Sequence, residues 1–148
     1  MVKIRDIMTS DVACCSPDTP LREVAQLMVR HDCGELPVCD DARRPVGVVT
    51  DRDIVCRIVA KGGDALARTA GDCMSDPVVT VTPEMEVAEC ARLMEQYRVR
   101  RVPVVGKDGA CCGMVAQADF ATKSTRDVTA EVVGRVSQPT ETASGVAS

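Results

Sequence analysis

Residues 45–55 carry the sequence PVGVVTDRDIV. Its first half, Val46 to Val49, is a short apolar run typical of a buried strand, and its second half reads as the start of a helix. Thr50 and Asp53 lie in the first turn of that helix, where backbone N–H groups are unpaired and carry a partial positive charge. Such a helix start can bind an anion, and Asp53 could accept hydrogen bonds from a ribose diol. We therefore predict a polar binding site where this strand meets its helix.

The same pattern returns 66 positions later, over residues 112–120. A constant offset without gaps relates many further residues, including Met8 and Met74, Pro17 and Pro83, Pro37 and Pro103, Gly47 and Gly113, and Asp53 and Asp119. Periodic self-similarity of this kind indicates a duplicated unit. We divide the chain into a first repeat with its leading helix (1–61), a linker (62–69), a second repeat (70–124) and a C-terminal extension (125–148). The extension is predicted to be disordered at its end because it is rich in Ser, Thr, Ala and Gly.

Each repeat is predicted to run strand, helix, strand, strand, helix, which makes the fold class α+β. For the first repeat we expect a leading helix at 3–8, strands at 12–15, 35–39 and 46–49, and helices from about 20 to 30 and from 51 to 59. For the second we expect strands at 79–81, 101–105 and 111–115, a helix starting at 82–84, and a helix at 117–123; a short helix could form at 65–68. One such unit buries too little apolar surface to be stable alone. We therefore expect two pseudo-symmetric copies packed sheet to sheet.

The composition excludes several classes of function. The chain is 45% hydrophobic and 27% charged, yet it has one Tyr, one Phe and no Trp. So few aromatic residues and a net charge of −4 argue against nucleic-acid binding. No apolar run approaches the roughly 20 residues needed to cross a membrane, and the N-terminus lacks a signal-peptide core. We expect a cytoplasmic protein with no membrane or nucleic-acid partner.

Cysteine is abundant, with nine residues, but histidine occurs once. No Cys-x-x-Cys pair is present, so the spacing does not favour a zinc site, and most cysteines are expected to be buried packing residues. A redox or metal-sensing role for cysteines brought together from different repeats stays open. Because no nucleophile and base are suitably paired, we predict no catalytic residues and no enzyme activity.

Both repeats resemble the cystathionine-β-synthase (CBS) domain. That family carries Gly, two apolar residues, Thr or Ser, two variable residues, and Asp or Asn. Gly47 to Asp53 meet the pattern in full, whereas Gly113 to Asp119 meet it in part because Ala116 replaces the hydroxyl residue. The Met-Thr and Met-Ser pairs at 8–9 and 74–75, and the Pro-Val pairs at 37–38 and 103–104, also resemble the family. The resemblance covers residues 3–124 and identifies a tandem CBS pair, a Bateman module, in a stand-alone protein.

What the resemblance implies is a regulatory module that binds AMP, ADP, ATP or S-adenosylmethionine between the repeats. In that family the Asp holds the ribose hydroxyls, the Thr meets phosphate, and basic residues of the other repeat neutralise it. A first cleft would then combine Thr50, Arg52 and Asp53 with Arg100 and Arg101. The module would need no further cofactor, would form a homodimer, and would signal ligand level to an unknown effector protein.

A second cleft would combine Asp119 and Ala116 with Gly34 and Glu35. We expect it to be weak, since a carboxylate at Glu35 would repel a phosphate where Arg101 attracts one. The sequence thus predicts one competent site and one degraded site.

Alternatives stay open at each step. Thr50 and Asp53 could be only a helix capping box, and Arg52, Arg100 and Arg101 could be ordinary solvated residues. At the level of the whole protein, the alternatives are a thiol or metal sensor that uses the cysteines, and an interaction scaffold whose clefts are vestigial.

Overall fold

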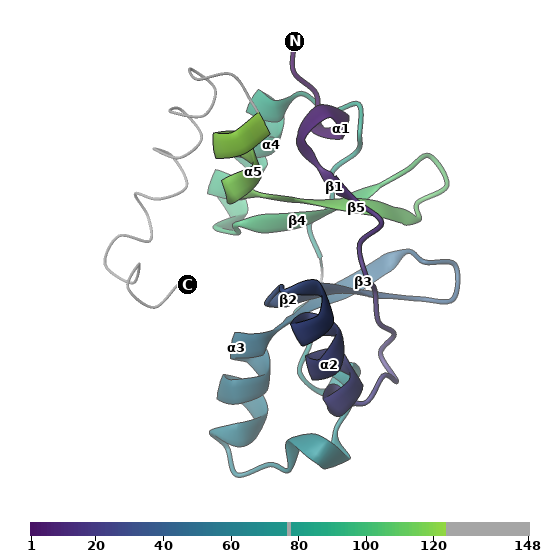
Figure 1. The fold of residues 1–148 in the computed structure, drawn as a ribbon, viewed down its shortest axis with the longest axis vertical. Coiled ribbons are helices and arrows are strands. Elements are labelled where there is room, and N and C mark those ends of the chain that lie inside the picture. Colours follow the sequence, from purple (N-terminus) through teal and green to yellow (C-terminus); the bar gives the residue numbers. More distant parts are fainter. Residues whose placement is uncertain (77, 124–148) are drawn as a thin grey trace. The chain divides into compact units, whose positions relative to one another are not determined.

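The computed structural model describes residues 1–76 and 78–123, which form two compact units (Figure 1). Unit 1 comprises residues 1–10, 79–106 and 112–123, and unit 2 comprises residues 11–76, 78 and 107–111. Both units mix helices with small sheets, which confirms the α+β class. Sheet-to-sheet packing of the two repeats stays a prediction.

Unit 2 is built around the antiparallel pair β2 (Glu35–Cys39) and β3 (Pro45–Thr50). Helix α2 (Leu21–His31) precedes this pair, and α3 (Asp51–Asp53) follows it and continues without a break as the π-helix η1 (Ile54–Val59). Two 3₁₀ turns close the unit, η2 (Ala65–Ala67) and η3 (Ala70–Asp72). Its core is aliphatic and includes Leu21, Val24, Met28, Leu36, Val38, Val49 and Ile58.

Unit 1 contains a three-stranded sheet in the order β1–β5–β4. Its strands are β1 (Thr9–Ser10), β4 (Arg101–Val105) and β5 (Cys111–Ala116), and its helices are α1 (Ile4–Ile7), α4 (Val87–Tyr97) and α5 (Gln117–Lys123). Fully buried side chains from both ends of the described chain meet in its core, among them Ile4, Ile7, Met94, Val104, Val115 and Phe120.

The duplication extends to the backbone hydrogen bonds. Asp51 N donates to the Gly34 carbonyl at 2.9 Å, and 66 residues later Gln117 N donates to the Arg100 carbonyl at 2.8 Å. Likewise, Cys39 N donates to Cys15 O at 2.7 Å in unit 2, and the equivalent Val105 N donates to Val81 O at 2.8 Å in unit 1. Equivalent donors and acceptors at a constant offset confirm two copies of one unit.

The two leading segments, residues 4–7 and 70–72, are exchanged between the repeats. Ile4 N donates to Met85 O at 2.9 Å, and the equivalent Ala70 N donates to Thr19 O at 2.8 Å. Each leading segment therefore packs on the body of the other repeat. Each compact unit therefore combines the leading segment of one sequence repeat with the body of the other repeat.

Most predicted elements are confirmed, but three expectations need correction. The strands expected at 12–15 and 79–81 are reduced to single parallel bridges, Cys15 to Val38 and Val81 to Val104. Helix α4 begins at Val87 rather than at 82–84, because residues 82–85 form a turn in which Met85 N bonds to Thr82 O at 3.2 Å. Strand β1 was not expected. The short helix at 65–68 is present as η2.

Two further points concern the limits of the chain. The predicted disordered extension at 125–148 lies outside the described residues. Within residues 1–76 and 78–123, no helix has both the length and the apolar character that a membrane crossing requires.

Candidate functional site

The start of α3 is closed by a reciprocal pair of hydrogen bonds between Thr50 and Asp53. Asp53 N donates to Thr50 Oγ1 at 3.0 Å, and Thr50 N donates to Asp53 Oδ2 at 3.0 Å. This is the geometry of a capping box, with Asp in place of the usual Glu. The capping interpretation of these two residues is confirmed.

The capping box leaves Thr50 and Asp53 able to form further hydrogen bonds at the helix start. The Asp53 side chain is 15% exposed, and its second oxygen, Oδ1, lies 3.6 Å from Arg57 Nε. A carboxylate offers about four lone-pair positions, and a hydroxyl that accepts one bond can still donate one. Asp53 could therefore accept from a diol, and Thr50 could donate to an anion, without dismantling the cap.

Arg57 is the residue that the sequence argument missed. Besides its ion pair with Asp53, its Nη1 donates to the Met74 carbonyl at 3.3 Å, which links η1 to the segment after η3. The available signal was its position four residues after Asp53, where opposite charges meet on one helix face. Arg57 orients the carboxylate that the sequence assigned to the ribose.

Arg52 and Asp51 lie on the exposed side of this helix start. Arg52 N donates to Asp51 Oδ1 at 2.8 Å, and the Asp51 carboxylate lies so close to Gly34 that an added Cβ there would be 2.9 Å from Oδ2. Glu35 is paired with Thr50 in the β2–β3 register. Asp51 and Glu35 thus border the Thr50 end of the site in unit 2. The basic residue nearest to Thr50 in sequence is the exposed Arg52.

In unit 1, only half of the box remains. Ala116 N donates to Asp119 Oδ2 at 2.8 Å, but Ala116 has no hydroxyl with which to return a bond. Arg100 is half-buried, and Arg101 is exposed at the first position of β4. Thr50, Arg52 and Asp53 belong to unit 2, whereas Arg100, Arg101 and Asp119 belong to unit 1. The first and second clefts as joint sites stay predictions.

Among residues 1–76 and 78–123, no group of three or more His, Cys, Asp or Glu side chains is arranged to hold a metal ion. The helix start itself offers a carboxylate and a hydroxyl that can form hydrogen bonds with a polar ligand.

Comparison with known proteins decides the family. The CBS domain matches twice, over residues 4–60 and 70–125. The chain belongs to the CBS-domain family. It contains a tandem CBS pair, and its relatives include stand-alone CBS-domain proteins.

The chain is 36% identical over 144 residues to hypoxic response protein 1 of Mycobacterium tuberculosis, which covers 97% of this chain and all of that protein. A crystal structure of hypoxic response protein I with two coordinated zinc ions has a TM-score of 0.74 and 38% identity, over 81% of this chain and 97% of that one. CBSX2 of Arabidopsis thaliana in complex with AMP has a TM-score of 0.69 and 26% identity, over 82% of this chain and 94% of that one.

Proposed function

We propose that this CBS-domain protein is a regulatory module that binds an adenosine-containing ligand. Asp53 accepts hydrogen bonds from the ribose hydroxyls, Thr50 donates to a phosphate oxygen, and Arg52, Arg100 and Arg101 neutralise the phosphate charge. Asp119 serves a second, weaker site. The protein reports ligand level to a partner through a change of shape or of homodimer, and it carries out no catalysis.

The observation that carries this proposal is the Thr50–Asp53 box. It holds a carboxylate and a hydroxyl at one helix start, where the backbone also favours an anion. Arg57 steadies the carboxylate from the side, so the acceptor is oriented before any ligand arrives. The related CBSX2, crystallised with AMP, supports adenosine as the ligand class.

The half box in unit 1 supports unequal sites. Asp119 still accepts from the Ala116 backbone, so a sugar acceptor is retained there, but Ala116 has no hydroxyl to offer a phosphate. We expect calorimetric titration with AMP to give about one strong site per chain, since one site keeps every polar group of the family pattern and the other does not.

The decisive experiment compares Asp53→Ala with Asp72→Ala. Asp72 caps η3 in the same way, with Thr69 N donating to its Oδ2 at 2.8 Å, so the second variant loses an equivalent cap in the same unit. We expect Asp53→Ala to weaken AMP binding by about tenfold or more, since one hydrogen bond to a charged group contributes ~1.5–3 kcal/mol. Asp72→Ala should bind AMP as the wild type does.

Equal affinity in the wild type and in Asp53→Ala would contradict the assignment of the ribose acceptor. Asp119→Ala tests the second site, and its effect on the strong site should be small.

The zinc in the related hypoxic response protein I favours metal sensing as a second candidate function. Stabilisation of the chain by zinc and not by AMP, ATP or S-adenosylmethionine would favour that candidate. Light scattering with and without ligand measures the expected change in the homodimer.

A further inference from the structure

Three cysteines from distant parts of the sequence meet in unit 2. Cys14 precedes the bridge at Cys15, Cys39 ends β2, and Cys111 begins β5. The bond from Cys39 N to Cys15 O, at 2.7 Å, holds the first two segments together. The bond from Cys111 N to Arg43 O, at 2.8 Å, holds the third segment against the β2–β3 turn. The backbone therefore brings the three segments that carry these cysteines together.

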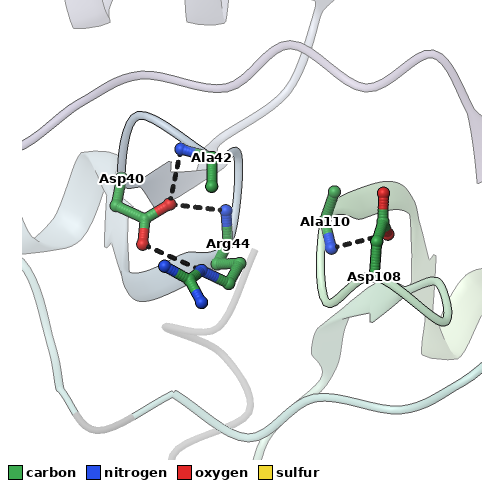
Figure 2. Close-up of polar contacts among 5 residues, drawn as sticks. All are labelled: Asp40, Ala42, Arg44, Asp108 and Ala110. Carbon is green, nitrogen blue, oxygen red and sulfur yellow. Dashed lines mark hydrogen bonds and ion pairs between the residues drawn. The ribbon is translucent and has the colours of Figure 1, made fainter.

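Two tight turns lie next to these cysteines in the sequence, and Figure 2 shows the polar contacts within each turn. In the turn after β2, Asp40 Oδ1 accepts from Ala42 N at 3.0 Å and from Arg44 N at 2.9 Å, and its Oδ2 accepts from Arg44 Nε at 3.2 Å. In the facing turn, Asp108 Oδ1 accepts from Ala110 N at 3.0 Å (Figure 2). These bonds define the conformation of both turns that flank the cysteines.

Gly109 lets the two turns approach each other. It has a φ of +82°, and an added Cβ there would lie 3.3 Å from Arg44 Cδ. A left-handed backbone and close packing at one position both favour glycine. The segment before Cys111 is thus held against the turn that follows Cys39.

Cys14, Cys39 and Cys111 lie close enough to act on one another: Cys39 and Cys111 both affect the pKa of Cys14, and Cys14 and Cys111 both raise the pKa of Cys39. Cys39 is 4% exposed and Cys111 is 6% exposed, whereas Cys14 is half-buried. Arg43 Nη2 also lies 3.7 Å from Cys14 Sγ. Cys14 is therefore the accessible member, and it has a cation beside its sulfur.

The hydrogen bond from Cys111 is the main reason that the pKa of Cys14 is raised, and Arg43 partly opposes that rise. The Cys14 thiol is consequently protonated at neutral pH and reacts slowly by itself. The thiols of Cys39 and Cys111 lie near it, however, so an oxidised Cys14 meets a second thiol without diffusion. Cys90 is a contrast within the same chain, since burial alone raises its pKa to about 12.

We propose that Cys14, Cys39 and Cys111 form a reversible oxidation site, in which Cys14 makes a disulfide with one of the two buried thiols. Hydrogen peroxide is the oxidant. The Cys14 sulfur attacks one peroxide oxygen, giving a sulfenic acid and one water. The thiol of Cys39 or Cys111 then displaces a second water and forms the S–S bond, so two thiols and one peroxide give one disulfide and two waters. The remaining thiol can exchange into that bond.

A disulfide fits these residues better than a metal ion does. Within residues 1–76 and 78–123, no three potential ligands have an arrangement suited to a metal, whereas a disulfide needs only two adjacent sulfurs. The site also does not depend on the Thr50–Asp53 helix start, so its failure and the failure of the proposed nucleotide site are separate results.

The test uses the full chain, reduced, metal-free and dilute, with the exposed Cys56 and Cys112 replaced by serine to prevent linkage between molecules. After exposure to hydrogen peroxide, thiols are counted in denaturant and the intact mass is measured. We expect the loss of two thiols, a mass lower by two hydrogen atoms, and a cross-linked peptide that contains Cys14. A reductant should restore both thiols.

Variants in the same background complete the test. Cys14→Ser should abolish the cross-link, and Arg43→Ala should slow its formation. Cys90→Ser should change neither the cross-link nor the rate at which it forms. Far-ultraviolet circular dichroism verifies that each variant is folded. Loss of two thiols at the wild-type rate in folded Cys14→Ser would overturn the proposal, as would oxidation of Cys14 to sulfinic or sulfonic acid without any cross-link. Retention of all thiols by the parent chain would also overturn it.

Discussion

Replacing Gly47 by alanine should test why the CBS motif begins with glycine. A Cβ at Gly47 would lie 2.8 Å from the Ser75 carbonyl oxygen and 2.9 Å from Met74 Sδ. The carbonyl cannot easily retreat, because Val48 N donates to Ser75 O at 3.1 Å and Ser75 N donates to Val48 O at 2.8 Å. The substitution must therefore strain this bridge or break it.

The magnitude follows from two opposing effects. Inserting a methyl group into a well-packed site costs about 1–3 kcal/mol. Alanine also lowers the conformational entropy of the unfolded chain, which stabilises the folded state by about 0.4–1 kcal/mol. We expect a net loss of about 1–2 kcal/mol in the free energy of unfolding. Gly113→Ala should behave alike, since its Cβ would lie 2.7 Å from the Thr9 carbonyl oxygen.

Gly34→Ala is the matched control. Its Cβ would also make a short contact, 2.9 Å, but with Oδ2 of the exposed Asp51 side chain, which can rotate away. We expect its stability to lie within about 0.5 kcal/mol of the wild type, as for ordinary surface substitutions. Urea unfolding followed by circular dichroism measures all three variants. If Gly47→Ala were as stable as Gly34→Ala, the argument from close backbone approach would be wrong.

Three other predictions concern stability. Ile4→Ala should cost about 2–5 kcal/mol, because Ile4 is fully buried in unit 1, and urea unfolding should show the loss. A silent Ile4→Ala would contradict the packing of the exchanged leading segment. Without ligand, Asp53→Ala should lower the free energy of unfolding by about 1–2 kcal/mol, because it removes a helix cap and a half-exposed ion pair. This loss should be slightly smaller in high salt, which screens the ion pair in the wild type. An unchanged melting temperature would contradict a stabilising role for the capping box. Burial raises the pKa of Cys90 to about 12, so the native thiol stays protonated where the unfolded thiol ionises. Stability should then fall as the pH rises from about 9 towards 12, by up to about 1.4 kcal/mol per pH unit for this group. Cys90→Ala should show a shallower decline under reducing conditions, and an identical slope would refute the assignment.

Much of the local structure could be predicted from the sequence. The bounds of β2, β4 and α5 agree with the expectation, because each is a short apolar run or helical segment bounded by turn residues. The Thr50–Asp53 box also follows from spacing alone, since both partners lie within one helical turn. The half box at Ala116 and Asp119 was predictable for the same reason.

The errors occurred where pairing partners are distant. β1 has only two exposed residues, Thr9 and Ser10, and it is a strand only because it pairs with Gly113 and Met114. The expected strands at 12–15 and 79–81 make one bridge each, since β-propensity has no effect without a neighbouring strand along its length. Helix α4 begins late because Met85 instead offers its carbonyl to Ile4.

By itself, the sequence determined that the chain is a duplication and that each copy carries a carboxylate one turn into a helix. It also determined that the capping box around this carboxylate is complete in the first copy and incomplete in the second. These properties depend on residues close together along the chain. The tertiary structure decided that each leading segment packs on the other repeat, that Arg57 steadies Asp53, and that Cys14, Cys39 and Cys111 share one site. The sequence of a leading segment does not indicate which of the two bodies it will join, and cysteines from three distant segments come together only through the path of the folded backbone.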